Sequence, residues 1–191
     1  MQLYFLLLGC KPTGRNTEQH DTFFGIGNSL HDLLPQIADF WPDGGRIHID
    51  SWRMITQVDR FAIKVVPKAE TAPSVNKLFF LNLGGYKPGD MEEYHYKMFV
   101  VAPDKATAVA AAKQSAFYKH TGFKGADSHI DDKYGVDVDD IYEIDEVLPE
   151  ALKQQYALSI TPVTEIKEDE LHIGYTKLSS LSAQADSIII E

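Results

Sequence analysis

The chain has 191 residues, of which 44% are hydrophobic and 24% are charged, a composition typical of globular proteins that excludes a disordered or fibrous chain. Its formal net charge of −10 argues against a general nucleic-acid binder or a protein of anionic membrane surfaces, and no apolar run approaches the ~20 residues of a membrane span. The single cysteine excludes an internal disulfide, so nothing requires an oxidising compartment.

The first half of the chain predicts four strands. Leu3–Leu8 is an apolar run closed by glycine, which is typical of a buried strand. Gly9–Asn16 is rich in glycine and other turn residues and predicts a loop, and His20–Ile26 predicts the second strand. A third strand is expected to begin near His48, and a fourth is expected over Phe61–Val66.

A helix is predicted between the second and third strands, because apolar residues recur there at helical spacing. These residues are Leu30, Leu33, Leu34, Ile37, Ala38 and Trp41. Ser29 and Asp32 resemble a capping box at its start. Pro35 lies inside the pattern, so we expect a kink or a short first turn at that residue.

The second half predicts the same order of elements after a polar linker, Lys68–Val75. The expected elements are a strand at Leu78–Leu83, a loop at Gly84–Asp90, a strand at His95–Val101, a helix capped by Asp104 and ended by Gly122, a strand beginning near His129 and a strand at Ile141–Leu148. A C-terminal extension, residues 150–191, has no counterpart in the first half. It contains one predicted strand within Glu170–Ser179.

The two halves also share residue identities. Residues 1–27 align without a gap to residues 76–102, and nine positions are identical. A later block repeats His-Ile-Asp at His48 and at His129. We therefore predict an α+β fold built by tandem duplication of a β-β-α-β-β module with pseudo-two-fold symmetry. The predicted organisation is residues 1–67 as the first module, 68–75 as linker, 76–149 as the second module and 150–191 as the extension.

Four local motifs suggest a function, and each has a simpler structural interpretation. Leu7–Cys10 resembles a lipoprotein cleavage box, but its twin recurs in mid-chain, so we expect a buried strand and an intact N-terminus. Gly9–Asn16 has the glycine spacing of a phosphate-binding loop, but it lacks the Lys-Ser/Thr pair that would contact the phosphates. A tight turn is the simpler interpretation of its glycines. Cys10 is a weak nucleophile candidate beside His20, because its counterpart is Gly85. The acidic stretch 127–146 lacks EF-hand spacing, which favours a solvated face over a calcium site.

A repeated set of histidines and carboxylates is the main candidate site. Its members are Glu18, His20, His48, Asp50, Glu93, His95, His129 and Asp131. Residues i and i+2 of a strand share a face, so pairing of the second and third strands would bring two imidazoles and two carboxylates together. Such groups bind zinc or iron, act as acid and base, bind another ligand or partner, or form structural hydrogen bonds. The sequence leaves these four interpretations open.

The arrangement of these motifs resembles a known family. A Leu-Gly-Gly loop followed by Glu-x-His, a strand, a helix and His-Ile-Asp is similar to the proteobacterial domain-of-unknown-function family fifteen forty-three, present here as two tandem copies. Family members have Glu-Leu-His-Asp where this chain has Glu18-Gln19-His20-Asp21 and, without the final Asp, Glu93-Tyr94-His95-Tyr96. The resemblance covers about residues 1–67 and 76–149 and implies a bacterial, cytosolic protein. It implies no activity.

The sequence therefore favours a non-enzymatic binding or interaction module in the cytoplasm. The alternative is a metal-binding protein or enzyme that uses the Glu-x-His and His-x-Asp pairs. We expect no cofactor, no nucleic-acid partner and no membrane association, and the sequence leaves a protein partner or a homodimer open.

Overall fold

The structure, a computed structural model, describes residues 1–86, 89, 91–114 and 137–181. Two compact units divide the chain. Unit 1 comprises Met1–Ala72 together with Leu148–Glu191, and unit 2 comprises Pro73–Val147. The boundary between Ala72 and Pro73 falls within the predicted linker, and the described residues of the C-terminal extension are part of unit 1.

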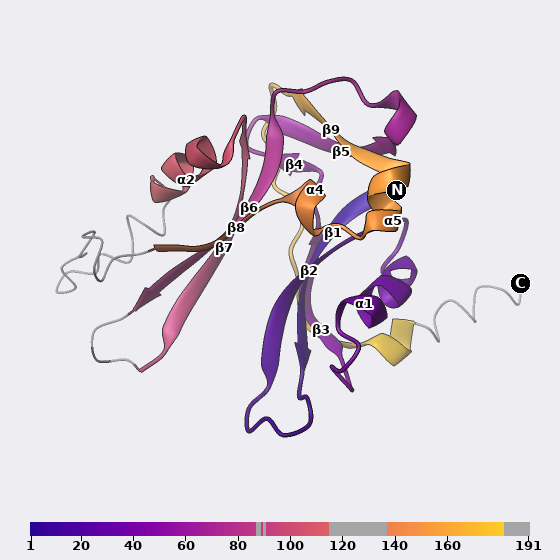
Figure 1. The fold of residues 1–191 in the computed structure, drawn as a ribbon, viewed down its shortest axis with the longest axis vertical. Coiled ribbons are helices and arrows are strands. Elements are labelled where there is room, and N and C mark those ends of the chain that lie inside the picture. The colour runs from indigo at the N-terminus through magenta and orange to yellow at the C-terminus, as the bar shows by residue number, and fades with distance from the viewer. Residues whose placement is uncertain (87–88, 90, 115–136, 182–191) are drawn as a thin grey trace, which may run out of the picture. The chain divides into compact units, whose positions relative to one another are not determined.

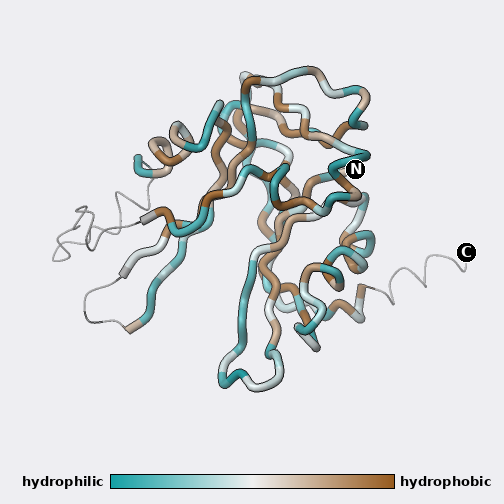
Figure 2. Tube along the Cα trace, in the orientation of Figure 1, coloured by the Kyte–Doolittle hydropathy of each residue, from teal (hydrophilic) through white to brown (hydrophobic). Residues whose placement is uncertain are grey.

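A four-stranded antiparallel sheet forms the centre of unit 1. Its strands are β1 (Gln2–Cys10), β2 (Gln19–Gly27), β3 (His48–Met54) and β10 (His172–Lys177), in the order β10-β3-β1-β2. Figure 1 shows β1 and β2 as a long hairpin, and Figure 2 shows that hydrophilic residues continue from its tip along the lower part of one strand. The predicted C-terminal strand is confirmed as β10, which forms one edge of this sheet.

One face of this sheet is covered by a short helical segment. It consists of η1 (His31–Leu33) and α1 (Leu34–Phe40), and the proline lies in the first turn of α1, as predicted. The Asp32 carboxylate accepts the backbone N–H of Asn28 at 2.8 Å and of Ser29 at 3.3 Å, which holds the start of the segment. The core beneath it contains Tyr4, Leu6, Leu8, Phe23, Leu33, Ile37 and Ile49. Each such side chain contributes about 1.5–3 kcal/mol on burial.

A second, smaller antiparallel sheet completes unit 1. It consists of β4 (Gln57–Val58), β5 (Phe61–Pro67) and β9 (Tyr156–Pro162), in the order β4-β5-β9. The fourth predicted strand is confirmed as β5, which pairs along its whole length with β9. The strand β9 was not predicted. It follows α5 (Glu150–Gln155), while η2 (Lys68–Glu70) follows β5.

Unit 2 contains a three-stranded antiparallel sheet. Its strands are β6 (Lys77–Tyr86), β7 (Glu93–Ala102) and β8 (Asp137–Glu143), in the order β7-β6-β8. The helix α2 (Lys105–Lys113) begins at the predicted cap, where the Asp104 carboxylate accepts the Thr107 N–H at 2.7 Å. Its buried Ala108 and Ala112 pack in one core with residues of β6 and β7. The predicted helix end, Gly122, lies outside the described residues.

One strand prediction for unit 2 needs correction, and another lies outside the described residues. The segment Ile141–Leu148 is not a fourth strand, because β8 ends at Glu143 and α4 (Ile144–Val147) follows it. The fully buried Ile144 and an ion pair between Lys105 and Glu146 at 2.8 Å hold this helical turn. The residues around His129 lie outside the described part of the chain, and the described strand that pairs with β6 begins at Asp137.

The predicted α+β class is confirmed, since strands predominate and a few short helices accompany them. The hairpin register is the same in both units: Gly9 pairs with His20 on β2, and Gly84 pairs with His95 on β7. A bulge interrupts the pairing with the third strand between Leu7 and Leu8 in unit 1, and between Asn82 and Leu83 in unit 2. Among the described residues, no helix has the length and apolar character to cross a membrane.

Candidate functional site

Gly9 on the central strand β1 is the structural centre of the first polar set. It pairs with His20 on β2 and with His48 on β3. Residues directly opposite in antiparallel strands share a face, so both imidazoles flank Gly9 on one face of the sheet. The helix α1 covers the other face, where Leu8 and Ile49 are buried. The second and third strands do not pair directly, because β1 lies between them, and the two imidazoles meet across Gly9 instead.

A glycine at this position lets the polar side chains approach the backbone. A Cβ atom on Gly9 would lie 2.4 Å from His48 Nε2 and 3.0 Å from Asp50 Oδ2. The first separation is too short for any real Cβ contact, and the second is tighter than most. Gly9 therefore provides the space in which side chains from both neighbouring strands meet.

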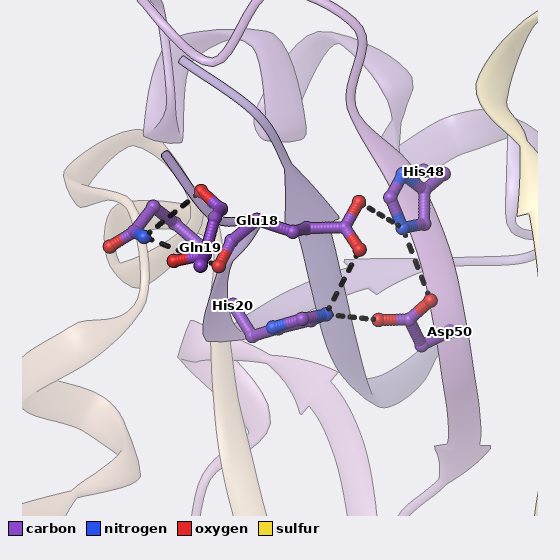
Figure 3. A network of polar contacts seen from close by, with 6 residues as sticks. Glu18, Gln19, His20, His48 and Asp50 are labelled. Atoms are coloured by element: carbon purple, nitrogen blue, oxygen red, sulfur yellow. Dashed lines mark hydrogen bonds and ion pairs between the residues drawn. The ribbon is translucent and has the colours of Figure 1, made fainter. Parts of the chain in front are cut away.

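The four residues of the first set form a closed ring (Figure 3). His48 Nε2 lies 3.3 Å from Glu18 Oε1 and 3.2 Å from Asp50 Oδ1. His20 Nε2 lies 3.7 Å from Glu18 Oε2 and 3.1 Å from Asp50 Oδ2. Each carboxylate thus directs one oxygen to each imidazole, and the same nitrogen of both imidazoles points into the ring. The structure brings together Glu18, His20, His48 and Asp50.

The ring is buried on one side and open on the other. His48 is only 4% exposed, and its ring lies 4.3 Å from the ring of Tyr175 on β10, measured between centroids. The side chains of Glu18 and His20 are each 45% exposed. The packed side holds one imidazole in place, while the open side leaves the oxygen and nitrogen atoms accessible from solvent.

Hydrogen bonding alone satisfies this ring poorly. An imidazole Nε2 carries at most one hydrogen, so two histidines supply two hydrogens for four nitrogen–oxygen contacts. The contacts of 3.1 to 3.7 Å are also longer than the ~2.7–2.9 Å of charge-assisted hydrogen bonds. By contrast, the donor atoms of a tetrahedral zinc site, at ~2.0–2.1 Å from the metal, lie about 3.3–3.4 Å from one another. Two imidazole nitrogens and two carboxylates are donors that zinc accepts. In this ring the four contacts use both oxygens of each carboxylate, one oxygen toward each imidazole.

The described part of the second set contains two predicted residues and one carboxylate that was not predicted. His95 Nε2 lies 3.9 Å from Glu93 Oε2 and 3.2 Å from Asp139 Oδ2, and all three donor atoms lie within 4.8 Å of one another. The other predicted members, His129 and Asp131, lie outside the described residues. Among the described residues, Asp139 is the carboxylate that completes this group.

A pattern in the sequence identifies Asp139, but it differs from the repeated His-Ile-Asp motif on which the prediction was based. Leu8 pairs with Ile49, which precedes Asp50, and Leu83 pairs with Val138, which precedes Asp139. An apolar residue followed by aspartate thus marks the third strand in both units. The segments before this strand differ in length, so a match of identical letters does not identify Asp139.

Cys10 does not fit a catalytic or metal-binding role. The residue is fully buried in β1. Burial raises the pKa of its thiol, and the Asp43 and Glu18 carboxylates raise the pKa further. A thiol with a raised pKa remains protonated, whereas nucleophiles and metal ligands are thiolates. The loop that follows leads into β2, so it does not present a helix N-terminus as phosphate loops do.

Part of the chain is similar to a known protein family. Residues 15–65 match the family described as Domain of Unknown Function (DUF1543). The resemblance predicted from the sequence is thereby confirmed for the first half of the chain. The matched range includes all four residues of the ring around Gly9. Among curated proteins, none matches the chain with significant similarity.

A solved structure has a similar fold. It is the crystal structure of a protein Il1583 from Idiomarina loihiensis, which is similar to this chain with a TM-score of 0.64 and 22% sequence identity. The similarity covers 93% of this chain and 97% of that chain. At this identity the similarity establishes the fold.

Proposed function

We propose that this protein is a binding module whose ligand is a divalent transition-metal ion, held by Glu18, His20, His48 and Asp50. Support comes from one observation above all: both Nε2 atoms and both carboxylates face one another in a ring with separations of 3.1 to 3.7 Å. Zinc is the favoured ion, because it accepts imidazole nitrogens and carboxylate oxygens together in tetrahedral sites.

Charge supports the same proposal. Two carboxylates converge on one point, and a divalent cation would neutralise both of them. The histidine Nε2 atoms would donate lone pairs to the ion, which removes the shortage of hydrogens described above. The packing of Tyr175 against His48 would hold that imidazole ready for the ion before it binds.

The tandem duplication predicted from the sequence is a second part of this proposal. Residues 1–67 and 76–149 are tandem copies of one module, and this duplication placed a polar set beside a glycine in each half. It is supported by the common hairpin register after a shift of 75 residues, by the bulge at the corresponding position and by a helix after each second strand. A cytoplasmic location agrees with the lone, buried and unpaired cysteine.

The test is a titration of the metal-stripped chain with Zn²⁺ by calorimetry, with Co²⁺ absorption as a spectroscopic check. We expect Glu18→Gln and His20→Ala each to weaken Zn²⁺ binding by about tenfold or more. Both side chains are half-exposed, so neither change should disrupt the core. His31→Ala removes an exposed histidine elsewhere in unit 1 and serves as the matched control.

Two results would contradict the proposal. One is a wild-type chain that binds Zn²⁺ no better than the Glu18→Gln chain. The other is a wild-type chain that binds no ion, together with a His20→Ala variant that melts at a lower temperature than the wild type. That result would make the ring a structural hydrogen-bond network.

A further inference from the structure

A second glycine-centred cluster in unit 2 repeats the strand positions of the first ring. Gly84 on β6 pairs with His95 on β7 and with Asp137 on β8, as Gly9 pairs with His20 and His48. A Cβ atom on Gly84 would lie 2.2 Å from Asp139 Oδ2 and 2.8 Å from Glu93 Oε1. The space above this glycine is therefore occupied by converging carboxylates.

The donor set in unit 2 is richer in oxygen. Glu93, His95 and Asp139 supply one imidazole and two carboxylates, with each side chain about one-third exposed. The first ring has two imidazoles and two carboxylates, so the described donors of the second cluster have the larger share of carboxylates.

We infer that Glu93, His95 and Asp139 form a second divalent-cation site, and that it differs from the first in its selectivity. Imidazole donors favour Zn²⁺, whereas carboxylate donors suit harder ions such as Mn²⁺ and Mg²⁺. The ratio of Zn²⁺ affinity to Mn²⁺ affinity is therefore lower at the second site than at the first. This inference rests on the proposed function only in that both sites use the same strand positions.

The experiment isolates the second site in a chain that carries Glu18→Gln and His20→Ala. Binding of Mn²⁺ is followed by loss of the electron paramagnetic resonance signal of the free ion. We expect this chain to bind one Mn²⁺, and Asp139→Asn to weaken that binding by about tenfold or more. Glu92→Gln removes an exposed carboxylate next to the cluster and should leave Mn²⁺ binding unchanged.

A comparison of two single-site chains tests the selectivity. The ratio of Zn²⁺ affinity to Mn²⁺ affinity should be lower by about tenfold in the Glu18→Gln, His20→Ala chain than in a chain that carries Asp139→Asn alone. Equal ratios in the two chains would overturn the selectivity part of the inference.

The outcomes separate the two proposals. If the isolated second site binds no Mn²⁺ while the wild-type chain binds Zn²⁺ through Glu18 and His20, the second site is refuted and the proposed function stands. If the isolated second site binds Mn²⁺ but the first ring binds no Zn²⁺, the proposed function fails and the second site stands. A wild-type chain that binds neither ion refutes both.

Discussion

Replacing Gly9 by alanine should push the His48 imidazole out of its place. The added methyl would lie 2.4 Å from His48 Nε2 and 2.9 Å from Cε1. Favourable heavy-atom contacts lie at about 3.5–4.0 Å, so the imidazole must move by roughly 1 Å or more. His48 is 4% exposed and packed against Tyr175, so that movement disturbs its surroundings.

The expected cost follows from overpacking. Inserting a methyl into a packed site costs about 1–3 kcal/mol of unfolding free energy. Because the clash is with His48, the cost of Gly9→Ala should largely disappear once His48 is already alanine. The double variant should therefore be more stable than the sum of the two single changes predicts, by about 1 kcal/mol or more.

The assay is urea unfolding of the wild type, the Gly9→Ala and His48→Ala variants and the double variant, which together form a double-mutant cycle. Unfolding is followed by far-ultraviolet circular dichroism in the presence of a chelator. A parallel cycle of Gly9→Ala with His31→Ala supplies the control, because His31 is an exposed residue of η1. That control cycle should be additive within about 0.5 kcal/mol. The reasoning is refuted if the Gly9 and His48 changes are also additive, or if Gly9→Ala unfolds at the wild-type urea concentration.

Two further predictions concern contacts outside the candidate sites. The hydrogen bond from the Thr107 N–H lowers the pKa of the Asp104 carboxyl in the folded state. The stabilising effect of this hydrogen bond is therefore complete above the pKa of the unfolded chain, about 3.9. The effect is lost as the pH falls through the lowered pKa of the folded state. Asp104→Asn keeps a capping side chain that does not titrate, so the stability difference between wild type and variant, measured by thermal melts, should change only over that acidic range. Asp169 accepts the N–H of Thr56 at 2.8 Å and of Gln57 at 3.2 Å, and it also accepts the Thr56 hydroxyl. Asp169→Ala should therefore lower the unfolding free energy in urea by about 1–3 kcal/mol, and an unchanged midpoint would contradict this role.

The sequence by itself determined the elements whose cause is local. The apolar run Leu3–Leu8 predicts a buried strand, and Pro35 predicts a short first turn, since proline cannot donate a backbone hydrogen bond inside a helix. Asp104 is recognised as a cap because a carboxylate just before a helix accepts a free N–H. The i and i+2 spacing of His48 and Asp50 likewise indicates that they share one face of a strand.

Only the tertiary structure decided which distant segments meet. The strand β1 lies between β2 and β3, so the polar side chains meet across Gly9, and no local pattern specifies that order. The same is true of β5, which pairs with the distant strand β9, and of Asp139, which faces His95 because of the register between β6 and β8. Strand order and register depend on long-range backbone pairing and on the burial of whole faces, so they depend on residues far apart in the chain.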